Sequence, residues 1–249
     1  MRLNRIAIVV LILIAATSLV IAQETLKTPP RPAAAGTPLT TPTQKMSYAV
    51  GLNTGNIVRS YDIKLDLPAL ARGFADALQD ARPVLSEKEF EQSIQEFEKL
   101  LREKQQQIAE TLGKKNKQDG AAFLAANAKR EGVKSLPSGL QYKPLIEGTG
   151  ATPKLGDSVK VHYTGKQLDG TVFESSVGQD PVTFTLTNQG LIPGWVEALP
   201  MMKTGSKWLL FVPSELAYKD RGQGEIGPNA TLVFEIELLG TGPAPAPAK

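Results

Sequence analysis

The chain has 249 residues, of which 41% are hydrophobic and 21% charged, and its formal net charge is +3. This composition is ordinary for a soluble globular protein, and the small charge argues against a nucleic-acid binder that works through bulk charge. There is no cysteine and one histidine, which excludes disulfides, thiolate metal sites, a cysteine nucleophile and a multi-histidine metal site.

Residues 1–22 predict an export signal. Arg2 and Arg5 precede an apolar run that starts at Ile6, and Val20 and Ala22 are the small residues wanted before a cleavage site. The alternative is an uncleaved anchor in the inner membrane, because the apolar stretch reaches about 17 residues, the shortest length that crosses a bilayer. In either case we expect the rest of the chain in the periplasm or another extracytoplasmic space.

Two segments have the composition of flexible, extended chain. Residues 23–44 are rich in proline, alanine and threonine without apolar periodicity, and residues 243–249 alternate proline and alanine before the final lysine. We therefore expect a tether at 23–44 and a tail at 243–249, with no packed structure in either.

Residues 45–134 have a helical pattern. Thr43 is expected to cap a first helix that ends near Ser60, and Asp66 is expected to cap a second. Ser86 and Glu89 have the spacing of a capping box that opens a long third helix.

The third helix contains a weak region. Gly113 and Gly120 each disfavour it by about 1 kcal/mol, and a polar run lies between them. A helical pattern then resumes to Arg130, after which Gly132 can end it.

The predicted helices carry one apolar stripe each, which is too little to build a stable core alone. We therefore expect residues 45–112 to form a dimerisation arm that a second copy of the chain completes. The alternative is a monomeric helical hairpin packed on the C-terminal domain. The stripes include Met46, Val50, Ile57, Leu67, Leu70, Phe74, Leu78, Phe90, Ile94, Phe97, Leu101 and Ile108.

After Pro137 the apolar period changes to two, which is typical of half-buried strands. Alternation is clear around 158–163, 182–186 and 232–239, and a short helix flanked by prolines is expected at 194–201. These elements predict an antiparallel sheet that curls over one short helix, so the fold class is α+β with an all-helical N-terminal arm. The predicted sheet domain spans 135–242.

The usual catalytic residues are scarce in this domain. His162 alternates with Val161 and Tyr163, which places it on the opposite face of a strand and favours a structural role. No serine nucleophile elbow occurs, and Gly222-Gln223-Gly224 lacks the continuation of a dinucleotide-binding fingerprint. We expect no metal and no cofactor. A set of aromatic and aliphatic side chains remains that can line an apolar pocket.

The block from Val161 to Leu239 resembles the FKBP family of peptidyl-prolyl cis–trans isomerases. The resemblance rests on several separate motifs in order: Val161-His-Tyr-Thr-Gly165, Asp169 to Ser176, Leu191-Ile-Pro-Gly-Trp195 and Ala230 to Leu239. The helical arm is similar to the N-terminal dimerisation domain of the macrophage infectivity potentiator and FkpA-like bacterial members.

The resemblance implies a function for each pocket position. It implies that Trp195 forms the floor, that Tyr218 donates to a substrate carbonyl and that Phe234 meets the proline ring. The full implied catalytic set is Tyr163, Phe173, Glu174, Trp195, Tyr218 and Phe234, and the implied substrate-binding set is Val182, Phe184, Leu191 and Ile192.

The sequence also departs from the family pattern. Val182 stands where many members carry a phenylalanine, Glu174 replaces an aspartate, and Lys219 replaces the glycine after the loop tyrosine. We expect these changes to alter the rate and substrate preference more than the fold. The resemblance implies an exported isomerase that acts on X-Pro bonds and binds unfolded polypeptides. The alternative is a chaperone-like binding module without meaningful turnover.

Overall fold

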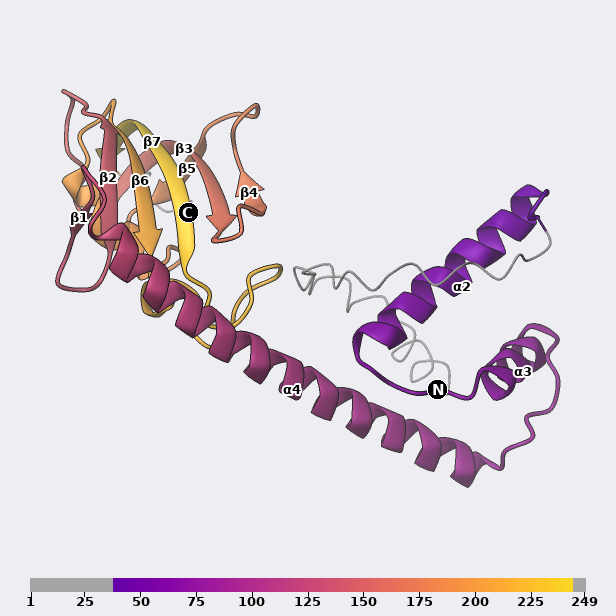
Figure 1. The fold of residues 1–249 in the computed structure, drawn as a ribbon. Helices are drawn as coiled ribbons and strands as arrows, with labels where there is room; N and C mark the ends of the chain where they lie inside the picture. The colour runs from indigo at the N-terminus through magenta and orange to yellow at the C-terminus, as the bar shows by residue number, and fades with distance from the viewer. Residues whose placement is uncertain (1–37, 244–249) are drawn as a thin grey trace. The chain divides into compact units, whose positions relative to one another are not determined.

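The computed structural model describes residues 38–243, which form two compact units, 38–110 and 111–243. The predicted export signal, most of the proline-rich tether and residues 244–249 lie outside the described residues. The first unit is helical and the second is an antiparallel sheet with a short helix (Figure 1). This confirms the predicted α+β class.

The helices begin close to the predicted caps. Helix α2, Pro42–Ser60, is capped by Thr41, whose side chain accepts from the Gln44 amide while Gln44 returns the bond. The cap therefore lies two residues before the predicted Thr43. Helix α3, Leu67–Leu78, is capped by Asp66 as predicted, with the carboxylate accepting from Ala69 N at 2.8 Å.

Helix α4, Glu87–Asn127, continues without interruption from the first unit into the second. The predicted capping box is present, because Ser86 N donates to Glu89 Oε2 at 2.9 Å and Glu89 N donates to the Ser86 hydroxyl at 3.3 Å. The Ser86 hydroxyl also donates to Glu89 Oε2 at 2.6 Å, and this bond is the main reason that the pKa of Glu89 is lowered. Among the described residues, no helix is both long and apolar enough to cross a membrane.

The helical unit has a small core. Tyr61, Ile63 and Leu101 are buried together, and the partly buried Ile57, Val58, Phe97 and Ile108 pack against them. Many other apolar side chains of this unit are exposed, among them Met46, Val50, Leu52, Leu67, Phe74 and Leu78.

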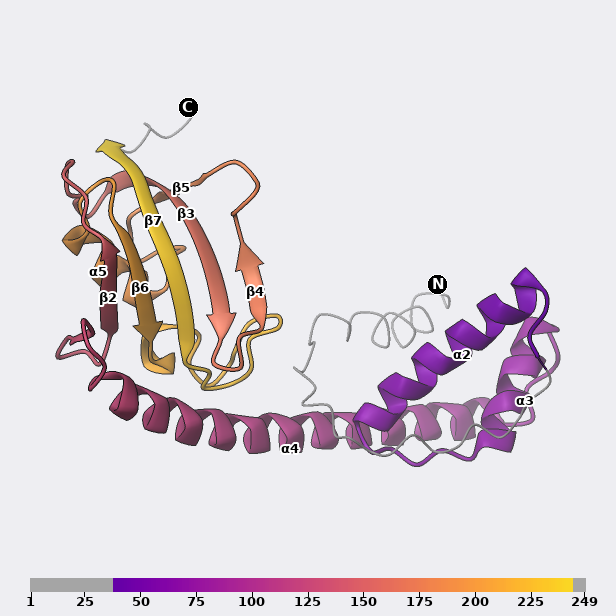
Figure 2. The same ribbon diagram turned by 45° about the horizontal axis from the view of Figure 1, so that its top comes forward.

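The sheet unit contains seven strands in the order β1-β2-β6-β7-β3-β4, with β5 also paired to β3. Strand β3, Asp157–Gln167, pairs along its length with β7, Leu232–Pro243, and its other edge is shared by β5, Val182–Thr185, and β4, Val172–Ser175. Strand β6 is Lys207–Val212, β2 is Gln141–Ile146 and β1 is Lys134–Ser135. Figures 1 and 2 show the resulting curved sheet.

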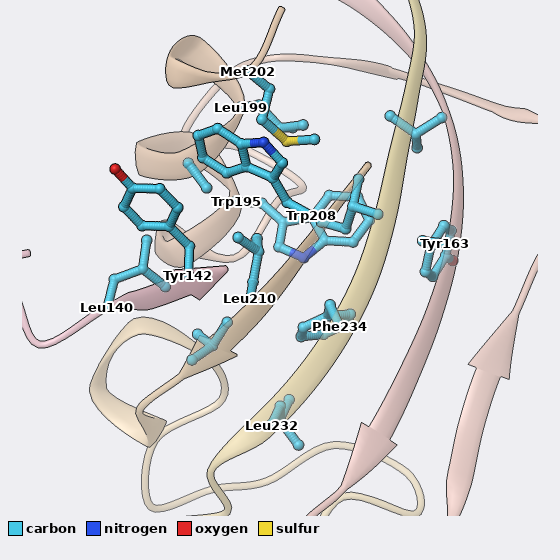
Figure 3. Packing of buried hydrophobic residues seen from close by; sticks show 14 of the residues in the cluster. Leu140, Tyr142, Tyr163, Trp195, Leu199, Met202, Trp208, Leu210, Leu232 and Phe234 are labelled. Atoms are coloured by element: carbon cyan, nitrogen blue, oxygen red, sulfur yellow. The ribbon is translucent and has the colours of Figure 1, made fainter. Parts of the chain in front are cut away.

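The core of this unit lies between the inner face of the sheet and the short helix α5, Pro193–Ala198, with the 3₁₀ turn Leu199–Met201 behind it. Alternation on β7 buries Leu232, Phe234, Ile236 and Leu238, as the sequence predicts. Figure 3 shows Leu199 and Met202 beside Trp195 and Trp208 in this core. Beside this core lies a cavity that is open to solvent.

Candidate functional site

A cavity of about 550 Å³ opens on the inner side of the sheet unit. Its walls come from β3, β4, β5 and β7, from α5 and the segment before it, and from the segment after β6. The lining residues are Tyr163, Glu174, Phe184, Gly190, Leu191, Ile192, Pro193, Trp195, Ala217, Tyr218, Gln223 and Phe234. Concave sites of this size with mostly apolar walls and a few polar groups are typical of small-ligand and peptide binding.

Trp195 is the centre of the aromatic wall. Its ring meets those of Tyr163, Phe184 and Phe234 edge to face, with centroid distances of 5.0, 5.7 and 5.4 Å. Each such pair contributes about 0.5–1.5 kcal/mol beyond area burial. Trp195 is only 3% exposed, so the indole is a rigid surface and not a mobile lid.

Local sequence fixes the position of that indole. Ile192 is extended and Pro193 occupies the first position of α5, where its missing N–H costs nothing. Gly194 packs against strand β6, since a methyl group there would lie 2.7 Å from Val212 Cγ1. Helix α5 therefore lies close to the sheet, and Trp195 projects into the ring cluster.

The polar side chains of the cavity are two tyrosine hydroxyls, the Glu174 carboxylate and the Gln223 amide. Burial raises the pKa of Tyr163, and its hydrogen bond to Glu174 raises that pKa further. Burial also raises the pKa of Tyr218, and the nearby charge of Glu174 adds to the effect. Because tyrosine already titrates near pH 10 in water, both hydroxyls keep their protons at neutral pH. Each can act as a hydrogen-bond donor.

Two residues that the sequence assigned to the pocket are not among the lining residues. Phe173 packs edge to face on Phe234 with centroids 5.7 Å apart, and a methyl group at Gly165 would lie 2.9 Å from the Phe234 ring. Val182 pairs with Val161 and is partly buried against the core. The other eight proposed positions all line the cavity. Phe173 thus supports a wall that Phe234 presents.

Sequence reasoning missed Gln223 as a lining residue, along with Gly190, Pro193 and Ala217. Gln223 lies in a loop that turns back on itself, with Gln223 N donating to Ile226 O at 2.8 Å and Ile226 N donating to Gln223 O at 2.9 Å. The two flanking glycines, Gly222 and Gly224, have positive φ. These glycines predicted a loop, but a loop pattern alone does not show which side chain faces a cavity.

His162 lies outside the cavity, as the strand alternation predicts. Its Nδ1 is 3.2 Å from the Ser176 hydroxyl, and that hydroxyl accepts from Tyr163 N at 2.9 Å. The serine therefore supports the β3 backbone. Within residues 38–243 no group of three or more His, Cys, Asp or Glu side chains is arranged to hold a metal ion.

Lys219, next to the cavity residue Tyr218, has φ of +54°. In this left-handed region a residue with a Cβ is disfavoured by about 1–2 kcal/mol relative to the right-handed form. Lys219 N donates to Ser214 O at 2.9 Å, and Lys219 O accepts from Asn229 N at 2.7 Å. This positive φ explains why the family usually has a glycine where this chain has Lys219.

Two protein families match the chain in adjacent segments. The family described as "FKBP-type peptidyl-prolyl cis-trans isomerase" matches residues 150–239, and the family described as "Domain amino terminal to FKBP-type peptidyl-prolyl isomerase" matches residues 43–143. The first match covers most of the sheet unit, and the second covers the helices that precede it.

Individual relatives cover most of the chain. The peptidyl-prolyl cis-trans isomerase Mip of Coxiella burnetii is 42% identical over 82% of this chain and 89% of its own length. An FKBP-type 22 kDa peptidyl-prolyl cis-trans isomerase of Escherichia coli is also 42% identical, over 81% of this chain and 98% of its own. The crystal structure of FkpA from Escherichia coli aligns with a TM-score of 0.64 and 38% identity, covering 84% of this chain and all (100%) of that one.

Proposed function

The chain belongs to the FKBP-type peptidyl-prolyl cis-trans isomerases and is an enzyme of that type, and we propose that the cavity around Trp195 is where it rotates X-Pro bonds. The observation that carries this proposal is a cavity whose aromatic wall is built around Trp195 and whose lining includes two tyrosine hydroxyls. Isomerisation makes and breaks no covalent bond, so the site needs no acid, base or nucleophile.

The barrier to rotation comes from amide resonance. Twisting the X-Pro bond removes the partial double bond, which costs about 18–20 kcal/mol and makes the unaided reaction take tens of seconds or longer. Resonance also places charge on the amide oxygen and nitrogen, so the twisted amide is less polar than the planar one. An apolar cavity therefore binds the twisted form in preference to the planar form, and such differential binding lowers the barrier.

In this mechanism each side chain of the cavity has a distinct part. Trp195 supports the proline ring from below and Phe234 meets its side, while Phe184, Leu191 and Ile192 exclude water. Tyr218 donates to a substrate carbonyl and holds it in the orientation that rotation needs. Tyr163 and Glu174 are hydrogen-bonded to each other, which fixes the polar edge of the site. Phe173 packs edge to face on Phe234 and holds that ring in place, and Val182 packs against the core of the sheet unit.

A protease-coupled assay on an X-Pro peptide tests this assignment. Phe234→Ala should lower kcat/KM by about 10-fold or more, equivalent to at least about 1.4 kcal/mol of transition-state stabilisation. Tyr218→Phe removes only a hydroxyl and should cost less. Glu215→Gln, beside the cavity but absent from its lining, is a matched control that should leave the rate unchanged. Wild-type rates in both pocket variants would show that the cavity is not the site.

We also propose that residues 45–112 form a homodimer. Support comes from side chains such as Leu67, which is 71% exposed, and Leu78, which is 85% exposed, in a unit whose buried core is small. Several large apolar side chains left exposed on one unit are typical of a protein–protein contact. Light scattering on the mature protein should give twice the chain mass, whereas a fragment that begins at Ser135, the predicted start of the isomerase domain, should be monomeric.

We propose further that the protein is exported and acts on proline-containing chains outside the cytoplasm. The basic and apolar pattern of residues 1–22 supports export, and one relative carries the name outer membrane protein MIP, from Legionella longbeachae, at 42% identity over 82% of this chain. N-terminal sequencing of the protein recovered after expression distinguishes cleavage after Ala22 from an uncleaved anchor.

A second candidate activity is binding of unfolded chains independently of turnover. The exposed apolar face of the helical unit favours it, because such a surface can hold extended apolar segments. Suppression of citrate synthase aggregation by the Phe234→Ala variant, at the wild-type level, is the expected result. Loss of both activities together would assign client binding to the cavity alone.

A further inference from the structure

One face of the last part of α4 is built from glycine and asparagine. Gly113, Asn116, Gly120 and Asn127 follow one another at spacings of three, four and seven residues, which places them on one side of a helix. Gly113, Gly120 and Asn127 are buried, whereas Gln118 on another side is exposed. Because glycine weakens a helix interior, its presence on a buried face points to a close approach of another segment of the chain.

The segment that makes this approach is 227–231, which enters β7. Asn116 Nδ2 donates to Pro228 O at 2.8 Å, and Asn229 Nδ2 donates to Gly113 O at 3.4 Å. A methyl group at Gly113 would lie 3.1 Å from Asn229 Nδ2, and one at Gly120 would overlap the Thr231 hydroxyl. Figures 1 and 2 show this loop against the final turns of α4.

The approach is equally tight from the side of the loop. A methyl group at Gly227 would lie 2.8 Å from Leu112 Cδ2. Farther along the helix, Phe123 packs on Phe211 with centroids 5.8 Å apart. Helix α4 thus contacts the sheet unit both at Leu112 and at Phe123.

The helix end is also tied to the first long strand of the sheet. Asn127 Nδ2 donates to Gln141 Oε1 at 2.9 Å, and Gln141 Nε2 donates to Leu124 O at 2.9 Å. Both amide side chains are buried, and buried polar pairs hold a defined geometry because an unpaired amide would be costly there. The final turn of α4 therefore has a single position on the sheet unit.

Backbone hydrogen bonds join segment 227–231 and its neighbour Ile226 to the residues at the cavity. Asn229 N donates to Lys219 O at 2.7 Å, and Lys219 directly follows the cavity residue Tyr218. Ile226, next to Gly227, exchanges two backbone hydrogen bonds with Gln223, the other cavity residue of this loop. Tyr218 is therefore linked to Asn229 through Lys219, and Gln223 is linked to Gly227 through Ile226.

The loop needs such support. Lys219 has φ of +54° and Asn229 has φ of +55°, and a residue with a side chain keeps this conformation only when its surroundings impose it. We propose that Asn116 and Gly120 are positioning residues of the isomerase: α4 holds segment 227–231, and that segment fixes Tyr218 and Gln223 at the cavity. The proposal rests on the proposed function of the cavity.

The first test introduces a methyl group at the point of closest approach in the full-length chain. Gly120→Ala should lower kcat/KM on an X-Pro peptide, and weaken binding of an FKBP-directed macrolide, by about 10-fold each, the range expected for a misplaced binding group. Both values are taken per folded chain. Adding Thr231→Ala removes the overlapping hydroxyl and should restore both values. Gln118→Ala, on the exposed side, is the matched control and should leave both unchanged.

A second test distinguishes positioning from general damage to the fold. Combining Gly120→Ala with Tyr218→Phe should produce a smaller additional loss than Gly120→Ala alone, because a residue that acts through Tyr218 has less to lose once that hydroxyl is absent. Asn116→Ala adds no atom and should lower kcat/KM by about 3-fold through loss of one hydrogen bond. If Gly120→Ala does not fold, Asn116→Ala replaces it in the comparison with Gln118→Ala and in the Tyr218→Phe background.

The outcomes separate this inference from the proposed function. Wild-type kcat/KM and macrolide affinity in Gly120→Ala and Asn116→Ala would overturn the inference, as would an undiminished effect in the Tyr218→Phe background. Failure of Thr231→Ala to restore the double variant would also overturn it. If the wild-type protein did not turn over X-Pro peptides, the proposed function would fail, while macrolide affinity would still test the positioning residues.

Discussion

The helical unit and the sheet unit place their apolar side chains in opposite ways. In the sheet unit, residues such as Leu210 and Ile236 are fully buried at 0% exposure, while in the helical unit Leu67 and Leu78 are 71% and 85% exposed. Both units show a clear apolar period in sequence. An apolar period therefore defines an apolar face without identifying what covers it: the sheet unit covers its own face, whereas the helical unit leaves its face exposed, which is the basis of the proposed dimer.

The largest effect should follow from damage to the core of the sheet unit. Leu210→Ala removes a fully buried side chain, and we expect the free energy of unfolding to fall by about 2–5 kcal/mol. Denaturant unfolding monitored by tryptophan fluorescence, since Trp195 and Trp208 both lie in this core, measures it. A loss below about 1 kcal/mol would mean that this core is not closely packed.

The next largest effect concerns the exposed helical face. Phe74→Asp places a charge where a single chain leaves the ring 54% exposed, and burial of that charge in a dimer should raise the dimer dissociation constant by about 100-fold or more. Analytical ultracentrifugation over a dilution series measures this constant. Gln92→Asp, at an exposed polar position of α4, should leave it unchanged. An unaltered dimer dissociation constant in Phe74→Asp would show that this face is not the dimer interface.

Replacing a glycine by alanine should change the free energy of unfolding in opposite directions in the two units. Gly73→Ala in α3 meets nothing within 4 Å, so it should raise the free energy of unfolding by about 0.5–1 kcal/mol through helix propensity. Gly148→Ala in the sheet unit would press on the backbone of 203–206 and should lower it by about 1–3 kcal/mol. Thermal unfolding of both variants measures the signs. The same sign in both would contradict the contrast between an open and a closed unit.

The smallest effect is a loss of stability at high pH in the sheet unit. The pKa values of Tyr163 and Tyr218 are raised in the folded state, chiefly by burial. The unfolded chain therefore releases these protons first, at about pH 10, and stability is fully present below that pH and falls as pH rises above it. Each tyrosine should contribute a slope of at most about 1.4 kcal/mol per pH unit. Tyr163→Phe should reduce the slope between pH 10 and 11, as measured by urea unfolding.

Much of the fold could be predicted from local residue chemistry. The Asp66 cap and the Ser86 capping box place helix starts, because each depends on a side chain and an amide three residues away. The continuous helix through Gly113 and Gly120 could not be predicted from propensity, since its support comes from segment 227–231, distant in sequence. The spacing of these glycines was the available signal.

Strands and site residues show the same division. Strand β7 alternates and was predicted, whereas Lys207–Val212 was not, because residues on both of its faces are buried and alternation is lost. Eight of the proposed pocket residues line the cavity. The absence of Phe173 and Val182 from the lining depends on tertiary packing, with Phe173 against Phe234 and Val182 paired with Val161.

The central claim is that the aromatic cavity of the sheet unit performs the isomerisation. The most direct test measures kcat/KM for an X-Pro peptide on the full-length protein, with and without an equimolar FKBP-directed macrolide that occupies the cavity. We predict measurable turnover that falls to the uncatalysed rate when the macrolide is bound. Turnover that persists with the cavity occupied would contradict the claim.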